Sequence, residues 1–464
     1  MRSGHLPTRP YRLAAVTLGL GLGLSLLSGC SRDGYDESLI YPVRTDWVVN
    51  PNNNWEQQPT GFNHPGILPL DALRLPEKEQ PPDVQKLHQE IGKKIYDPTE
   101  LGAAVRAEYG TALLDMFGTP AHPKVSGLDP AALKAAEDSM TADQVVNDLK
   151  LDEATLAEGS RLYRQQCLHC HGLEGNGRGP TGYWVNPPPR DYRQGIFKYT
   201  SSNQDQNLRK PRREDLLRVL TAGVEGTSMP SFGVLPREDL EKIASYVIHL
   251  SLRGEAEYAT MLDQLKDPNK KVVMVLRTDL PDPSVRKALE DNLALAASRW
   301  VAAQKADAAI KPDGYPYPDT EDAFVESAAR GAKIFIGTGG CISCHQNFGR
   351  ESNLTYDSWG TIVRGRNIYD GIYRGGRRPL DLYYRVYGGI NGAGMTSYKD
   401  LKDKLKDLFG ENKLKPADVG LTSAEQLGGI DPLWDLVNFL KAAAFPDLRA
   451  RLRDQYKVTS MPEF

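Results

Sequence analysis

Apolar residues recur every three or four positions in several stretches of the chain, which predicts a mainly α-helical protein. Each stretch is expected to be an amphipathic helix with its apolar face buried. The apolar positions are Leu156, Leu162 and Tyr163; Leu240, Ile243, Val247 and Leu250; Val285, Leu289, Leu293 and Ala296; Phe324, Ala328, Ile334 and Phe335; and Leu433, Trp434, Val437 and Leu440. Asp152 and Asp431 stand where helix N-caps are expected, and Pro432 suits a first helical position.

The first 29 residues have the pattern of a targeting signal rather than of a folded element. Three arginines precede an apolar run over residues 13–27, which is too short for a comfortable membrane-spanning helix and ends in small residues. Residues 27–30, Leu-Ser-Gly-Cys, resemble the bacterial lipobox, in which the cysteine is acylated and becomes the new N-terminus. This resemblance implies a lipid anchor on Cys30 and a location at the periplasmic face of a bacterial membrane. The alternative is a plain signal peptide that contains a cysteine.

Breaks in the apolar pattern divide the rest of the chain. Prolines interrupt every periodicity in residues 31–80, and a second proline-rich break precedes residue 321. Scattered aromatic residues in the first stretch, Tyr41 among them, favour docking on the protein's own surface, with docking on a partner as the alternative. The predicted segments are 1–29, a lipoprotein signal peptide; 30–82, an extended tether; 83–151, a helical N-terminal region; 152–252, a first domain; 253–322, a helical connector; 323–446, a second domain; and 447–464, a C-terminal tail.

Each predicted domain contains the same five-residue motif directly after its first helix. The motifs are Cys167-Leu168-His169-Cys170-His171 and Cys341-Ile342-Ser343-Cys344-His345. C-x-x-C-H is the attachment signature of a c-type haem, in which the thiols add across the vinyl groups and the histidine binds the iron. A redox dithiol or half of a zinc site is the alternative, but neither requires a histidine after both pairs. The pairs also stand about 170 residues apart, unlike zinc modules. We therefore predict two covalently bound haem c groups.

Composition agrees with this prediction and argues against other classes. Of five cysteines, four belong to the motifs and the fifth is Cys30, which leaves none for structural disulfides. The formal net charge of −3 argues against nucleic-acid binding. A basic run at residues 209–213 either steers acidic partners toward a haem edge, or forms a solvated face, or pairs with haem propionates. The sequence favours none of these three interpretations.

The sixth ligand of each iron follows by elimination among the side chains that bind low-spin haem iron. After the first motif the choices in that domain are Met229, in a Gly-Thr-Ser-Met-Pro loop before the last helix, and His249, on that helix. A histidine on the helix is expected to be packed or solvated. No histidine follows the second motif, so the second domain offers Met395, in a Gly-rich loop, with Met461 in the tail. We expect Met229 and Met395 to bind the irons.

Around both motifs the sequence resembles class I cytochromes c. In that family the first and last helices cross at close range, with a glycine and an aromatic residue at the contact. The matching residues are Gly159, Tyr163 and Tyr246 in the first domain and Gly331, Phe335 and Phe439 in the second. Met229 stands where the family has its distal methionine, and Pro180 resembles the proline whose carbonyl accepts the proximal imidazole N–H. The second domain departs from the family, because no proline stands at the matching distance after its motif and residues 399–430 are a charged insertion.

The resemblance implies two class I cytochrome c domains joined by a helical connector and preceded by an extended, partly helical N-terminal region. It also implies electron transfer rather than catalysis. We predict a membrane-tethered carrier between respiratory-chain partners, which are a respiratory complex, an oxidase or a soluble cytochrome, with no small-molecule substrate. One alternative is a dihaem cytochrome c peroxidase, an enzyme that needs one iron with an open or displaceable site. Another is a cytochrome subunit fixed in a larger oxidase or quinol-oxidising complex.

Overall fold

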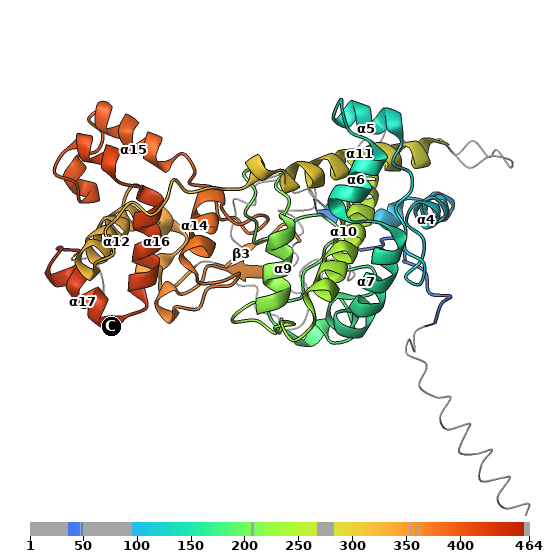
Figure 1. The fold of residues 1–464 in the computed structure, drawn as a ribbon, viewed down its shortest axis with the longest axis horizontal. Helices are drawn as coiled ribbons and strands as arrows, with labels where there is room; N and C mark the ends of the chain where they lie inside the picture. Colours follow the sequence, from blue (N-terminus) through green and yellow to red (C-terminus); the bar gives the residue numbers. More distant parts are fainter. Residues whose placement is uncertain are drawn as a thin grey trace, which may run out of the picture. The chain divides into compact units, whose positions relative to one another are not determined.

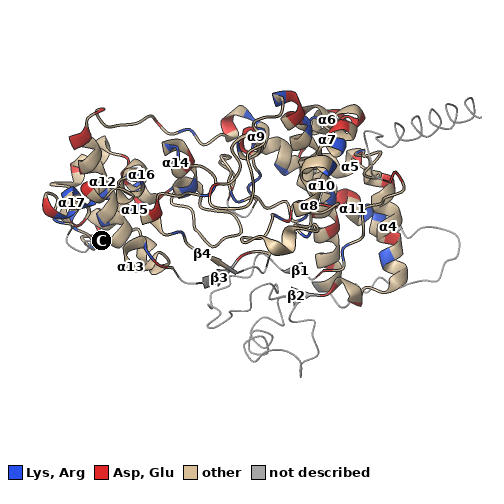
Figure 2. Cartoon of the chain, turned by 90° about the horizontal axis from the view of Figure 1, so that it is seen from below, with Lys and Arg blue, Asp and Glu red and all other residues tan. Residues whose placement is uncertain are grey.

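The computed structural model describes residues 36–46, 48–49, 95–205, 208–266, 283–352, 354–359 and 362–458. The described residues are mainly helical, which confirms the fold class that the apolar spacing predicts. The strands of the described ranges form two short antiparallel pairs, β1 (Val48–Val49) with β2 (Ile95–Tyr96) and β3 (Leu354–Tyr356) with β4 (Ile362–Arg364) (Figure 2). None of the described helices combines the length and the apolar character needed to cross a membrane. The predicted anchor Cys30, most of the tether and Met461 lie outside the described residues.

The described residues from 40 onward belong to one compact unit with two main hydrophobic cores. The helices of the first core are α4 (Ala103–Phe117), α5 (Pro130–Ala136), α6 (Ala142–Leu149), α7 (Glu153–Gln166), α9 (Arg213–Ala222), α10 (Arg237–Lys266) and α11 (Pro283–Gln304) (Figure 1). The helices of the second core are α12 (Glu321–Ile336), α14 (Pro379–Gly388), α15 (Leu401–Gly410), α16 (Pro432–Ala443) and α17 (Pro446–Asp454). The first core thus includes α7 and α10 together with helices of the N-terminal region and the connector, and the second core includes α12 and α16.

Helices α7 and α10 cross at Gly159, as the sequence predicts. A Cβ at this position would collide with the backbone carbonyl of Lys242, so only glycine lets the two helices approach this closely. The rings of Tyr163 and Tyr246 pack beside the crossing with their centroids 5.2 Å apart. The crossing fixes the C-terminal end of α7, from which the first motif begins.

Helices α12 and α16 repeat this arrangement in the second core. A Cβ on Gly331 would collide with the backbone carbonyl of Asp435, and the rings of Phe335 and Phe439 lie 5.2 Å apart. The side chain of Asp431 accepts a hydrogen bond from the backbone N–H at the start of α16, which confirms it as the N-cap. The two predicted helix pairs thus have the same contact residues in the structure.

The N-terminal region and the connector pack on the first domain. Tyr41 is buried, and its hydroxyl lies 2.7 Å from the hydroxyl of Tyr246, which confirms docking of this residue on the protein's own surface. Helix α11 buries its predicted apolar stripe against α10 and the N-terminal helices. Helix α10 continues past residue 252 to Lys266, so the predicted boundary of the first domain lies inside a helix. Helix α17 occupies much of the predicted tail and packs on α12 and α16.

Candidate functional site

The first motif forms one helical turn at the end of α7. Cys167 ends α7 by donating its backbone N–H to the Tyr163 carbonyl at 2.8 Å, and it begins α8 (Leu168–His171) by accepting from the His171 N–H at 2.9 Å. The four described cysteines are free thiols. Burial raises the pKa of the Cys167 thiol to about 12, so this thiol stays protonated at neutral pH. Cys170 lies one turn further on, with its sulfur 3.1 Å from the Thr181 hydroxyl.

A cavity of about 340 Å³ brings the predicted residues of this site together. Cys167, Cys170, His171 and Met229 all line it, although Met229 stands 58 residues after His171 in the chain. The volume of the cavity is in the usual range of ligand cavities, about 300–1,000 Å³. Much of the apolar wall comes from α9, α10 and the loop between them: Leu216, Leu220, Val224, Phe232, Ile243 and Val247. Two thiols, an imidazole and a thioether around an apolar cavity are the groups that a covalent haem requires.

The imidazole of His171 is oriented by a backbone carbonyl and by an aromatic ring. Its Nδ1 donates to the Arg190 carbonyl at 3.1 Å, and the Tyr192 ring stacks on it with centroids 4.8 Å apart. Burial lowers the pKa of His171 to about 4, so the ring is neutral at physiological pH. With the proton on Nδ1, the Nε2 lone pair is available to a metal.

The prediction that Pro180 supplies this acceptor is wrong. Pro180 is exposed, and its neighbours bond back to the motif itself: the Gly179 N–H donates to the Cys170 carbonyl and the Thr181 N–H to the His169 carbonyl. These bonds fold the turn against the backbone of the motif rather than toward the imidazole. Arg190, ten residues further on, supplies the carbonyl instead.

In the second motif, too, the histidine is oriented by a backbone carbonyl. The Nδ1 of His345 donates to the Arg366 carbonyl at 3.3 Å, which identifies the acceptor that the sequence left open. A Cβ on the preceding Gly365 would lie 3.0 Å from Cε1 of the imidazole, so the backbone passes very close to the ring. Burial lowers the pKa of His345, as it does for the first proximal histidine. Cys341 is half-buried and Cys344 is exposed.

Met395 stands in a tight turn beside the second motif. The Ile390 N–H donates to the Met395 carbonyl at 3.0 Å, closing the Gly-rich loop that the sequence indicates. Three residues later the Tyr398 hydroxyl donates to the Gly339 carbonyl at 2.8 Å and lies 3.8 Å from the Cys341 sulfur. The segment that carries Met395 therefore packs against the start of the motif.

The remaining histidines near the first site have structural or peripheral positions. His249 is buried, and its Nε2 lies 3.1 Å from the Phe117 carbonyl and 3.0 Å from the Lys124 carbonyl. These contacts attach α10 to the N-terminal region, which confirms that His249 is packed. His169, inside the motif, is exposed.

The basic run at residues 209–213 is neither a solvated face nor a steering surface. Arg209, Lys210 and Arg213 are buried. Arg209 donates to the Gly388 carbonyl, Lys210 binds Glu255, and Arg213 binds Glu241 at 2.7 Å. These bonds attach the start of α9 to neighbouring elements. The sequence missed this role because burial of a cationic run depends on partners that are distant in the chain.

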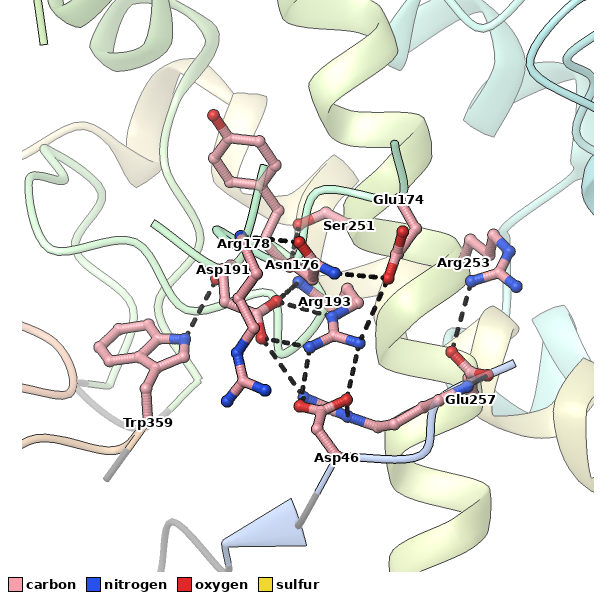
Figure 3. A network of polar contacts seen from close by, with 12 residues as sticks. Asp46, Glu174, Asn176, Arg178, Asp191, Arg193, Ser251, Arg253, Glu257 and Trp359 are labelled. Atoms are coloured by element: carbon pink, nitrogen blue, oxygen red, sulfur yellow. Dashed lines mark hydrogen bonds and ion pairs between the residues drawn. The ribbon is translucent and has the colours of Figure 1, made fainter. Parts of the chain in front are cut away.

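A network of buried charges fixes the loop that carries the acceptor carbonyl of the first site (Figure 3). Arg193 binds Asp191 at 2.7 Å and Asp46 at 2.8 Å, and Arg44 contacts both carboxylates at 3.3–3.4 Å. Burial raises the pKa of the Asp46 carboxyl, but the guanidinium groups of Arg193 and Arg44 outweigh it and hold this pKa well below its usual range. The described part of the tether thus contributes directly to the surroundings of Arg190.

Comparison with known proteins identifies the first domain. A family model described as "Cytochrome C oxidase, cbb3-type, subunit III" matches residues 154–247. These residues form a cytochrome c family domain, and such a domain binds haem c covalently. No curated protein matches the chain. A solved chain of the "Kuenenia stuttgartiensis reducing HAO-like protein complex Kustc0457/Kustc0458" is similar over 62% of this chain and 96% of that one. The two chains are 20% identical, and the TM-score is 0.39.

Proposed function

We propose that the chain binds two covalent haem c groups and transfers electrons between redox protein partners. The observation that carries the proposal is that both motifs have the same contact between the histidine and the backbone. In each motif the histidine donates its Nδ1 proton to a backbone carbonyl, that of Arg190 or of Arg366. Such a bond fixes the tautomer and the orientation of the ring and raises its basicity as an iron ligand.

Each set of residues has a definite role in this proposal. Haem, when bound, supplies a one-electron couple between ferric and ferrous iron. The cysteines of each motif attach it, and the apolar wall of the first cavity keeps water away from it. His171 and Met229 would hold the iron of the haem at the first motif, and His345 and Met395 would hold the iron at the second. Thioether ligation favours the ferrous state and therefore a high reduction potential.

A carrier and a peroxidase differ in whether peroxide can reach an iron. Met229 lines the same cavity as His171, which supports a closed first site. We expect the reduced, fully loaded protein to bind carbon monoxide weakly and the oxidised protein to contain two low-spin haems. Rapid peroxide turnover, or a native high-spin haem, would overturn the carrier assignment in favour of the enzyme.

A second candidate function is that of a cytochrome subunit fixed in a larger complex. The family model that matches the first domain is named for a subunit of an oxidase, which favours this candidate. Purification from native membranes in mild detergent distinguishes the two. A carrier separates from its partners during purification, whereas a fixed subunit stays with the same partner chains in constant ratio.

We further propose that the protein is anchored through a lipid on Cys30 at the periplasmic face of the membrane. The support is the lipobox-like sequence at residues 27–30. Replacing Cys30 with Ser is expected to release the chain into the soluble periplasmic fraction. Continued membrane attachment of the variant in the absence of other subunits would contradict acylation.

A further inference from the structure

The cavity at the first motif is closed in part by the second domain. Four residues of this domain line the cavity and are called here the second-domain wall: Asp357, Trp359, Val363 and Arg374. Trp359 donates its indole N–H to the Asp191 carbonyl at 3.1 Å (Figure 3). The guanidinium of Arg190 lies 3.7 Å from the centre of the same indole, a close cation–π contact. The second-domain wall therefore packs directly on the loop that orients His171.

Cations gather where the two domains meet at this cavity. Arg190, Lys198 and Arg374 all line it, and Lys198 binds Asp357 at 3.2 Å. Among the described residues, neither arginine has a carboxylate within ion-pair distance, and Nε of Arg374 is buried without a hydrogen-bond partner. Burial lowers the pKa of both guanidinium groups. Burial, with Arg190 nearby, also lowers the pKa of Lys198 to about 8.

The other carboxylates that line the cavity already have cationic partners. Asp46 and Asp191 bind Arg193, and Asp215 binds Arg218 at 2.9 Å. They are therefore not available to Arg190 and Arg374. A desolvated guanidinium is costly without an anion, so the surroundings of these two arginines suit a ligand that brings carboxylates of its own.

We propose that Arg374 of the second domain and Arg190 of the first bind the propionate carboxylates of the haem attached at Cys167 and Cys170, called here the first haem. The inference rests on the proposed function, because it requires haem at the first motif. The vinyl groups of a haem react with the thiols, and its propionates are the carboxylates that it brings to the site. Guanidinium groups bind carboxylates in paired hydrogen bonds that are strong where water is excluded. The site of the first haem is then built by both domains, and its potential depends on a residue of the second.

The test is a spectroelectrochemical titration of the full, haem-loaded chain carrying Arg374→Gln. Arg364→Gln is the matched control, because it removes the same charge from an exposed position on β4 near Arg374. The couple that moves in Met229→Ala is assigned to the first haem. Loss of the Arg374 cation is expected to favour ferric iron about tenfold at the first haem, a fall of about 59 mV for one electron. The control variant is expected to change this equilibrium less than twofold.

Each outcome decides the inference. The inference would be overturned if the first haem had the same potential in Arg374→Gln and Arg364→Gln, with both haems attached. Loss of the first haem alone from Arg374→Gln supports it if Arg374→Lys restores attachment, and contradicts it if the lysine does not. Should Arg374→Gln fail to accumulate, Arg190→Gln is titrated instead, with the same expectation and control. An intact mass without haem on either motif of the unmodified chain would be a failure of the proposed function instead.

Discussion

At the scale of single residues, one backbone carbonyl positions the imidazole of each motif. The acceptors stand 19 residues after His171 and 21 residues after His345. Because a backbone carbonyl accepts the Nδ1 proton, the tautomer of the imidazole does not depend on an ionisable partner. Loops, rather than helices, thus determine the orientation of the two rings.

The first prediction concerns the replacement of Met229 and Met395. Met229→Ala and Met395→Ala should each open one iron site, allow carbon monoxide to bind the reduced protein, and lower the potential of that haem by more than about 59 mV, a tenfold change in equilibrium. The physical reason is the loss of a thioether that favours ferrous iron. Redox titration and carbon monoxide difference spectra measure both effects. Met140→Ala, which removes a buried methionine from the N-terminal region, should change neither potential. A distal variant with an unchanged potential would remove that methionine from the ligand set.

The residues that could be singled out from the sequence are those whose spacing is set by covalent chemistry. The cysteines and histidine of each motif must stand on one turn, so their identity is visible in the chain, and the loop methionine Met229 does line the cavity with the first motif. The acceptor at Arg190 was missed because any residue can supply a backbone carbonyl. Trp359 and Arg374 were missed because they reach the first site from the other domain.

At the scale of elements, the helix crossings set the stability of each domain. Gly159→Ala should destabilise the first core, and Gly331→Ala should destabilise the second. Each substitution should cost about 1–3 kcal/mol, because the added methyl collides with the backbone of the facing helix. Denaturant unfolding followed by circular dichroism measures the change. Gly410→Ala is the control, since a Cβ there meets nothing within 4 Å, and it should stay within about 0.5 kcal/mol of the parent. Full stability of Gly159→Ala would contradict the close crossing.

The ion pairs of Asp46 predict how the stability of the docked N-terminal segment depends on pH. The pKa of Asp46 in the folded protein lies below its unfolded value of about 3.9. The contribution of the Asp46 carboxylate to folding stability is therefore complete above about pH 3.9 and is lost as the pH falls through the folded-state pKa. Asp46→Asn should therefore cost about 1.5–3 kcal/mol at neutral pH and progressively less in acid. Hydrogen exchange of residues 40–46 and of the loop at Arg193 measures the loss against pH. Asp307→Asn, at an exposed position, is the control. A destabilisation by Asp46→Asn that increases as the pH falls would contradict the ion pairs assigned to Asp46.

At the scale of the whole molecule, two helical units with the same crossing and the same motif stand in one chain. The first and last helix of each unit followed from apolar spacing, because each of these helices buries one continuous stripe. The helices between them, α9 in the first unit and α14 and α15 in the second, were not predicted. The extent of α10 did not follow, since its second half is covered by α11 and the N-terminal helices, which come from other parts of the chain. The packing of the second-domain wall on the first site was not predictable for the same reason.

The most direct test of the central claim is the intact mass of the full chain, purified from cells competent in haem attachment. The account predicts a mass increase of two haems. It also predicts an increase of one haem in a chain with Cys167 and Cys170 replaced by Ala, and of one haem in a chain with Cys341 and Cys344 replaced by Ala. A parent mass with fewer than two haems, or a variant that keeps both, would contradict it.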